Sequence, residues 1–487
     1  MTSALILLPL GAALVIWLAP LDRLAVVGLA LAAALAEIAL WITTVIRFDL
    51  DESSIQFSQQ ATWFKDLHVS FHVGLYSYSL WLVGMTVIVM GAAIAYAVWA
   101  GRERPRAYFG LMLFLMAAVV AVFEAQDLLL FYVAWEAMLI PLYFLIGVWG
   151  GTGRAAATYK FVVYTIAGSL LMLASIIVYG VQQGTFDMTQ TKPSGSMWLF
   201  LGFAAAFAIK APLFPFHGWL AQTYRESPPE VAAVLSGVVS KTAAYGFIRF
   251  GVIEFGGPSQ DVRNVVLALA TVGLVYGSIV AFRQPDLRGI LAYSSLAQMG
   301  LITMGIYAID LGGLNGAVLQ MVNHGLISGV MFLLAGIIER RAGTGDVARL
   351  GGMARGRPIL STLLLVGGMI ALAVPGSTTF AGEFLILAGV FSSGWGWTVV
   401  GAVAIVLAAM YALRLISAVL HDRKGEAVTD SARDLRLPEL AFVLPLIACL
   451  IALSVWPAAI TGHTFGKATE RCNPLANVLT LTAEDCP

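Results

Sequence analysis

Long apolar runs recur along the whole sequence and constrain its fold more than any other feature. Each run holds roughly 20 residues, which is enough to cross a hydrocarbon core of about 30 Å as a helix. Charged residues, Pro or Gly bound the runs, which lie near 3–20, 24–46, 75–100, 107–124, 127–149, 158–182, 196–221, 229–255, 262–282, 287–309, 315–338, 359–391, 398–420 and 437–460. They predict an all-α membrane protein of about fourteen transmembrane helices.

Composition supports the same class. Of 487 residues, 59% are hydrophobic and 11% are charged, and the mean hydropathy is +0.86. A soluble globular chain has about 25% charged residues, so this chain has too little polar surface to face water. The 28 basic and 28 acidic residues balance, which excludes a nucleic-acid partner attracted by bulk charge. The run 3–20 lacks a charged leader and a cleavage site, so we expect a first span and not a signal peptide.

Basic residues predict the orientation, because cytoplasmic loops carry an excess of Lys and Arg. One set of alternate connections holds Arg102, Arg104, Arg106, Arg154, Lys160, Arg283, Arg288, Arg340, Arg341, Arg349, Arg355, Arg357, Arg423, Lys424, Arg433 and Arg436. The opposite set holds only Arg47, Lys65, Lys192, Arg263, Lys467 and Arg471. We therefore expect a multi-pass protein of a bacterial inner membrane with both termini on the periplasmic side. There Cys472 and Cys486 form a disulfide or stay as two free thiols, while Cys449 packs inside the last run.

Two spans are interrupted. The run 196–221 contains Lys-Ala-Pro-Leu-Phe-Pro at 210–215, and the run 359–391 contains Pro375-Gly376 with Gly382. Proline removes a backbone donor and clashes with the preceding turn, so we expect broken seventh and twelfth helices. Breaks at matching places predict two inverted five-helix repeats, formed by helices 4–8 and 9–13. The domains are then 1–100 with an external amphipathic loop at 47–74, repeats at 107–255 and 262–420, and a last helix with an external tail at 437–487.

Five ionisable residues lie in five different apolar runs: Glu136, Lys210, Lys241, His324 and Glu383. A charge inside a bilayer is costly unless it is paired or hydrated, and such residues mark ion and proton paths. A bundle can align them into one file, in which a lysine loses or regains its proton as Glu136 moves. His324 suits a relay because histidine titrates near neutrality, and Glu383 is the terminal group. The alternative is a set of structural ion pairs between helices; five separate spans and two helix breaks favour the path.

Other polar residues have simpler interpretations. His217 is either a polar neighbour of the path or a packed histidine bonded to backbone, and haem ligation has no supporting spacing. Glu124, Asp127 and Glu226 lie near helix ends, where capping or solvation is the default. Glu37 either meets a partner subunit or extends toward the membrane surface. The sequence has no Cys-x-x-Cys, metal-ligand cluster or phosphate-binding glycine loop, so we expect no metal and no cofactor in this chain.

Several motifs resemble those of one family. They are Trp-Glu-Ala-Met-Leu-Ile-Pro at 135–141, Tyr-Lys-Phe-Val-Val-Tyr-Thr-Ile-Ala-Gly-Ser at 159–169, Lys-Ala-Pro-Leu-Phe-Pro-Phe-His-Gly-Trp-Leu at 210–220, Asp-Leu-Arg-Gly-Ile-Leu-Ala-Tyr-Ser-Ser at 286–295 and Thr-Thr-Phe-Ala-Gly-Glu-Phe at 378–384. Together they resemble the chain M family of antiporter-like subunits of proton-pumping NADH:quinone oxidoreductase, respiratory complex I. The resemblance covers nearly the whole chain beyond residue 75.

The resemblance implies fourteen helices with two inverted repeats, and a role for the five charged residues in moving protons. It implies that NADH, FMN, iron–sulfur clusters and quinone belong to partner subunits, and that chains L and N are neighbours. Glu383 favours chain M, since chains L and N and Mrp-type cation/proton antiporters usually have lysine there. Gln298 stands where the family usually has histidine, so the central relay is expected to use water. Tyr76-Ser77 likewise replaces the family's Asp-Gly.

Three other functions remain as alternatives to a complex I subunit. One is a subunit of an Mrp-type antiporter or of a related hydrogenase or plastoquinone-linked complex. The second is a structural membrane subunit without transport, against which the five charged residues argue. The third is an enzyme with its own cofactor, for which the sequence has no motif.

Overall fold

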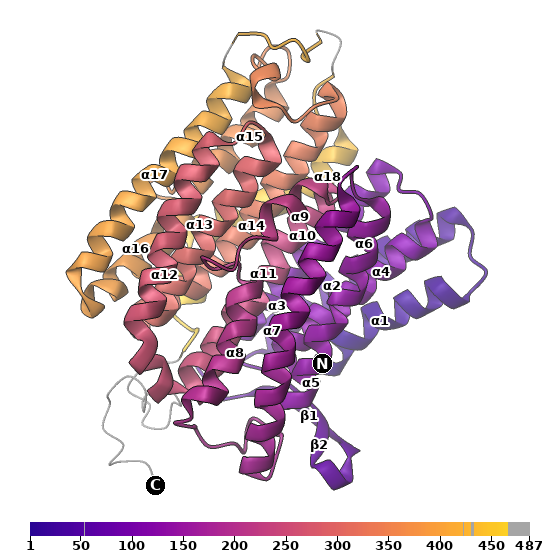
Figure 1. Cartoon of the computed structure of the whole chain (residues 1–487). Coiled ribbons are helices and arrows are strands. Elements are labelled where there is room, and N and C mark those ends of the chain that lie inside the picture. Colours follow the sequence, from indigo (N-terminus) through magenta and orange to yellow (C-terminus); the bar gives the residue numbers. More distant parts are fainter. Residues whose placement is uncertain (53, 422, 430–432, 466–487) are drawn as a thin grey trace.

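The computed structural model describes residues 1–487 except 53, 422, 430–432 and 466–487. Most of the described chain is helical (Figure 1), and eleven of the described helices are long and apolar enough to cross a membrane. Four shorter apolar helices, Thr2–Leu18, Met197–Lys210, Pro358–Ala371 and Thr378–Ser393, add to them. The all-α membrane class is confirmed, whereas the count of fourteen crossings stays a prediction. Cys472 and Cys486, for which a disulfide and two free thiols were both open, lie outside the described residues.

The first part of the chain contains three helices and a β-hairpin. The elements are α1 (Thr2–Leu18), α2 (Arg23–Arg47), β1 (Gln56–Phe64), β2 (Val69–Leu75) and α3 (Ser77–Ala100). The segment 47–74, expected as an external amphipathic loop, contains a β-hairpin in which β1 and β2 pair as antiparallel strands. The β2 strand is largely buried while most of β1 is exposed, so only one strand reads as apolar.

The next part includes the first predicted repeat. Its helices are α4 (Pro105–Glu124), α5 (Leu128–Ala137), α6 (Leu139–Trp149), α7 (Arg154–Gln183), α8 (Met197–Lys210), α9 (Leu220–Glu226), α10 (Pro229–Val234) and α11 (Ser240–Gly246). Two π-helical segments, Leu235–Val239 and Phe247–Glu254, flank α11, so residues 229–254 form one rod with two widened stretches. The break predicted in the seventh span is confirmed, because α8 ends at Lys210 before the two prolines.

The last part includes the second predicted repeat. Its helices are α12 (Gly256–Arg283), α13 (Leu287–Tyr307), α14 (Leu311–Ala342), α15 (Pro358–Ala371), α16 (Thr378–Ser393), α17 (Trp395–Leu420), α18 (Leu437–Val455) and α19 (Ala458–Thr461). The second break is also confirmed, since residues 372–377 separate α15 from α16. Gly382 is not part of the break: it lies inside α16, where a Cβ would come within 2.6 Å of Gln320.

Two isolated backbone bridges occupy corresponding places in the two predicted repeats. Asp127, just before α5, pairs with Asp187 after α7, and Asp286, just before α13, pairs with Asp346 after α14. In each case the residue before the second helix of a repeat meets the residue after its third helix. An inverted repeat puts such a pair on opposite sides of the membrane, as the chain path does here. The repeat itself stays a prediction, and this symmetry supports it.

The bundle has two ends that the helices connect. The hairpin and the N-terminus lie at one end, at the bottom of Figure 1, which we call the hairpin face. The connections before α4 and before α15 lie at the other end (Figure 1), which we call the basic face because these connections contain Arg102, Arg104, Arg349, Arg355 and Arg357. Between these ends, α14 and the rod 229–254 are buried over their apolar length, whereas α2 is largely exposed. The centre of the bundle is therefore formed by α14 and this rod.

Two aspartates attach the hairpin to the bundle. The backbone N–H of Ser70 donates to Asp127 Oδ2 at 3.0 Å, and His72 Nδ1 lies 3.1 Å from Asp187 Oδ2. Burial alone would raise the pKa of the Asp187 carboxyl, but hydrogen bonds from His72 and Thr189 outweigh burial and hold that pKa below its usual range. The charged form of Asp187 is thus stabilised by the fold.

We predict that Asp187→Asn loosens the hairpin. Loss of hydrogen bonds to a charged group costs about 1.5–3 kcal/mol, which should speed amide exchange in β1 and β2 by at least about tenfold. Because the folded pKa is depressed, the stabilisation is present above the unfolded value near 3.8 and is lost as pH falls through the folded value. Hydrogen-exchange mass spectrometry measures this. Asp66→Asn, on the exposed turn of the hairpin, is the matched control; equal exchange in both variants contradicts the prediction.

Candidate proton path

Lys210 ends α8 at the point where the helix breaks. Its side chain is 4% exposed, and Nζ lies 3.7 Å from the centre of the Trp135 ring and 3.4 Å from the Trp135 carbonyl oxygen. Glu136 follows Trp135 near the end of α5, and it is close enough to act on the Lys210 ammonium electrostatically. No ion pair joins the two side chains in the described part of the chain. The lysine is thus held by the ring and the carbonyl group of Trp135, and the Glu136 carboxylate belongs to the next residue along the chain.

Lys241 and His324 meet at the centre of the bundle. Lys241, on α11, is fully buried, and its Nζ lies 2.5 Å from Nδ1 of His324 on α14. Nζ also donates to the Ser236 carbonyl oxygen at 2.7 Å, a group of the π-helical segment before α11. Such widened turns are frequent at functional sites, because they free carbonyl groups from the helical pattern. The lysine and the imidazole therefore form a direct pair between two buried helices.

Hydroxyl groups extend this pair. Ser328, one turn after His324, lies 3.4 Å from its Nε2 and 2.9 Å from the Ser236 hydroxyl. The Ser236 hydroxyl also lies 3.0 Å from the hydroxyl of Ser295 on α13. Hydroxyls both donate and accept hydrogen bonds, so they can pass a proton in either direction. No local pattern distinguishes these serines from other buried hydroxyls of the helices.

Glu383 lies on α16, just after the second break, and is 4% exposed. The amide of Gln298 donates to Glu383 Oε1 at 3.1 Å, and the amide of Gln320 on α14 donates to Gln298 Oε1 at 2.8 Å. Asn323, next to His324, donates to Gln320 at 3.3 Å. Gln298 was singled out as a departure from the family pattern, and the structure brings it into direct contact with Glu383.

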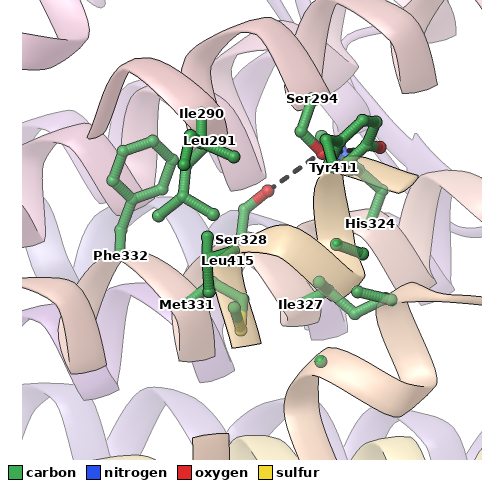
Figure 2. Close-up of a pocket in the computed structure, with 13 residues that line it drawn as sticks. Ile290, Leu291, Ser294, His324, Ile327, Ser328, Met331, Phe332, Tyr411 and Leu415 are labelled. Carbon is green, nitrogen blue, oxygen red and sulfur yellow. Dashed lines mark hydrogen bonds between the residues drawn. The ribbon is translucent and has the colours of Figure 1, made fainter. Parts of the chain in front are cut away.

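A small cavity lies beside His324 (Figure 2). It has a volume of about 40 Å³ and is lined by groups of α13, α14, α15 and α17, including Ser294 and Tyr411. The Ser294 hydroxyl donates to the Tyr411 hydroxyl at 2.9 Å. The volume exceeds what one water needs, and the cavity has several polar partners for it. This cavity is a place where water can join His324 to the hydroxyl of Tyr411, which lies within electrostatic range of Glu383.

The five predicted residues thus fall into three groups. Lys210 with Glu136 forms one, Lys241 with His324 a second, and Glu383 with Gln298 a third. Side chains of α14 and the cavity connect the second group to the third. Between the first and second groups, α8 packs closely on α11. A Cβ atom added at Gly246 of α11 would lie 2.4 Å from the ring of Phe207 on α8, so only glycine fits there.

His217 lies in the break after α8 and is surrounded by aromatic rings. Its imidazole stacks on Phe214 with ring centres 5.5 Å apart and lies 5.1 Å from the ring of Tyr276. Its Nδ1 has no hydrogen-bond partner among the described residues. The expected backbone hydrogen bond is therefore absent at Nδ1, and a role of His217 in the path stays a prediction.

The carboxylates near helix ends differ from one another. Asp127 accepts from the backbone N–H groups of Leu129 and Leu130, and Glu226 accepts from Gly153 N just before α7, so the capping expectation is confirmed for both. It is wrong for Glu124, which ends α4 but is fully buried, with neither carboxylate oxygen hydrogen-bonded to any described residue. A helix-end position predicted exposure, whereas the Glu124 side chain is enclosed by the protein. Glu37 is buried in the same way, which excludes extension to the membrane surface.

Comparisons with known proteins agree on one family. The family model described as "NADH:quinone oxidoreductase/Mrp antiporter, TM" matches residues 125–408. The chain is 35% identical to NADH-quinone oxidoreductase subunit M of Rhodobacter capsulatus, covering 85% of this chain and 84% of that protein. It is 34% identical to the subunit M of Mycobacterium tuberculosis, covering 94% and 91%.

Solved structures share the fold. A chain of respiratory complex I from Thermus thermophilus with bound NADH matches with a TM-score of 0.89 and 28% identity, over 99% of both chains. A chain of the Mrp complex from Dietzia sp. DQ12-45-1b matches with a TM-score of 0.85 and 23% identity, over 99% of this chain and 98% of that one. The second likeness concerns the fold alone.

Proposed function

Since the chain belongs to the NADH:quinone oxidoreductase/Mrp antiporter family of transmembrane proteins, we propose that its buried polar groups move protons across the membrane as part of an NADH:quinone oxidoreductase. It is a subunit M-type membrane chain of that enzyme complex. The observation that carries the proposal is the contact series from Lys241 through His324 toward Glu383, because each member is buried and each can hold or pass a proton.

The mechanism starts at Lys210. A nearby carboxylate favours the charged form of a buried lysine, so movement of Glu136 toward or away from Lys210 makes the ammonium gain or lose its proton. The helix break beside Lys210 allows such movement without disrupting the rest of α8. The proton then reaches Lys241, which transfers it to His324 Nδ1 across 2.5 Å. These transfers change only the charges of this chain's own side chains.

The second half of the path uses hydroxyls and water. His324 releases a proton from Nε2 toward Ser328 and the cavity, and Tyr411 with Ser294 takes it on toward Glu383. Gln298 orients the Glu383 carboxylate but cannot carry a net proton itself. A neutral amide in this place therefore makes the cavity water part of the route.

The setting of the chain is also part of the proposal. The basic face lies in the cytoplasm of a bacterium and the hairpin face in the periplasm, where both termini are placed. Chains L and N of the complex pack on either side of the exposed apolar helices, while NADH, FMN, iron–sulfur clusters and quinone are held by other subunits. Redox energy reaches Lys210 through the neighbouring membrane subunits.

A direct test deletes the gene for this chain and measures the acidification of inside-out membrane vesicles when NADH is added. NADH-driven acidification should be lost on deletion and restored by the wild-type gene. Undiminished acidification without the chain contradicts the proposal. Loss of sodium/proton exchange instead of NADH-driven acidification would assign the chain to an Mrp-type antiporter, the second candidate, whose fold it shares. Glu383 favours the first assignment.

Tyr411→Phe should slow proton translocation by about 2- to 10-fold. The variant removes one hydroxyl beside the cavity, and one neutral hydrogen bond is worth about 0.5–1.5 kcal/mol. The NADH-driven acidification rate of vesicles measures the effect. Tyr143→Phe, whose ring is exposed on α6, is the matched control. Equal rates for both variants would remove Tyr411 from the path.

A further inference from the structure

A groove lies on the basic face, where the connection between α1 and α2 meets the start of α4. It has a volume of about 360 Å³, and its lining includes three arginines, Arg23, Arg104 and Arg106. Asp22 also lines the groove, and its carboxylate accepts from the backbone N–H of Ala25 as the N-cap of α2. The groove therefore has an excess of positive charge, with three arginines against one aspartate.

Carboxylates of the fold do not neutralise these arginines. Arg102, two residues before Arg104, shows the contrast, because its guanidinium donates to both carboxylate oxygens of the buried Glu230 at 2.6 Å. Within the described part of the chain, no ion pair joins Arg23, Arg104 or Arg106 to a carboxylate. All three side chains are exposed. They are thus available to an anion from outside the chain.

Arg106 fixes the two walls of the groove to each other. Its Nη2 donates to the carbonyl oxygens of Ala19 at 2.9 Å and Leu21 at 2.7 Å, which joins the α1–α2 connection to the first turn of α4. That turn has no side-chain cap among the described residues, and its N-cap Arg104 has a φ of 51°. An uncapped helix N-terminus attracts phosphate through its backbone N–H groups and its dipole. The groove therefore combines a helix N-terminus with its arginines.

Exposed apolar residues flank the groove along the chain. Leu18, the last residue of α1, is 82% exposed, and Leu24, in the first turn of α2, is 80% exposed. Exposed Leu35 and Ile42 continue this apolar surface along α2. Basic groups at a membrane surface beside apolar side chains match the headgroup and the acyl chains of an anionic lipid. A soluble anion would use the arginines and leave the apolar surface uncovered.

We propose that this groove binds an anionic phospholipid of the leaflet at the basic face. The phosphate group lies against Arg23, Arg104 and the N-terminus of α4, and an acyl chain follows the exposed apolar surface of α2. An anionic headgroup is favoured over a zwitterionic one because one aspartate does not offset three arginines. The site uses no residue of the proton path, so the inference goes beyond the proposed function.

The test uses the whole complex in phosphatidylcholine proteoliposomes with a trace of phosphatidylglycerol that carries a photoreactive diazirine in its acyl chain. We expect light to attach this lipid to the segments 18–26 and 100–107, which peptide mass spectrometry detects. Unlabelled phosphatidylglycerol should compete for the cross-link, whereas additional phosphatidylcholine should not.

The variant that tests the arginines combines Arg23→Gln with Arg104→Gln. Each arginine near an anionic lipid surface contributes about fivefold to affinity, so the yield of the cross-link should fall by at least about tenfold. Arg106 is kept because it holds the groove together. The matched control, Arg283→Gln with Arg355→Gln, removes two exposed arginines outside the groove and should keep the wild-type yield.

Several results would overturn the inference. Equal yields in the two double variants would show that the arginines do not hold the lipid, and equal competition by phosphatidylcholine would show apolar contact without recognition of charge. Loss of the cross-link in inorganic phosphate, but not in chloride of the same ionic strength, would assign the groove to a soluble anion. No cross-link at either segment would show that another subunit covers the groove. Should the double variant fail to assemble, the competition series with the wild-type complex decides.

Discussion

Lys210→Ala should abolish both proton pumping and NADH:quinone turnover while the complex still assembles. Among the described residues the ammonium is held by the Trp135 carbonyl and ring, so truncation removes the charge without leaving a buried counter-ion directly paired to it. Loss of a proton-transfer group costs about 100-fold or more in rate. We expect a fall of at least that size in vesicles that contain the complex, measured as NADH oxidation and as internal acidification.

The matched control for this variant is Lys65→Ala, which removes an exposed lysine from the hairpin. Glu136→Gln should reproduce the Lys210 effect in part, because it removes the charge that acts on the lysine. If Lys210→Ala pumps and turns over like wild type, the intramembrane charges are structural and the proposed mechanism is wrong. That result would leave the family assignment intact.

Glu383→Gln should have the second largest effect. Glutamine can still accept the hydrogen bond from Gln298, so the packing around α16 is kept while the ionisable group is lost. Pumping should therefore fall by about 100-fold or more without loss of assembly. The acidification rate per assembled complex, with assembly followed by native gel electrophoresis, measures it.

Glu103→Gln, an exposed carboxylate on the basic face, serves as the control for Glu383. Wild-type pumping in Glu383→Gln would show that protons leave by another group.

The sequence predicted those features that depend on local chemistry. Proline lies deep in an apolar run at 212, 215 and 375, and both predicted breaks are present there, whereas Pro9 and Pro445 lie inside continuous helices. Lys241, His324 and Glu383 were found because a charge inside an apolar run needs a partner. The pairing of Lys241 with His324 could not be read from spacing, since the two residues are 83 positions apart and meet only through helix packing.

Other features have no local signal. Tyr411 and Ser328 are single hydroxyls on apolar helices, and nothing in their sequence neighbourhood separates a relay group from a packed one. The π-helical segments beside Lys241 occur in a sequence that reads as ordinary helix. The hairpin was missed because most of β1 is exposed, so it lacks the alternation that marks a half-buried strand. Glu124 was misread because its burial follows from the packing of the bundle, which a position near a helix end does not predict.

The contrast in burial between central and outer helices has an evolutionary consequence. The apolar length of α14 and of residues 229–254 is enclosed by protein, whereas only 28% of α2 and 39% of α17 is. A substitution in the enclosed helices must conserve volume, because close-packed interiors tolerate neither voids nor extra atoms. A lipid-facing residue need only remain apolar, since lipid tails adapt to any shape. Neutral drift should therefore accumulate on the outer helices, and the pace of sequence divergence should fall from the rim of the bundle to its centre.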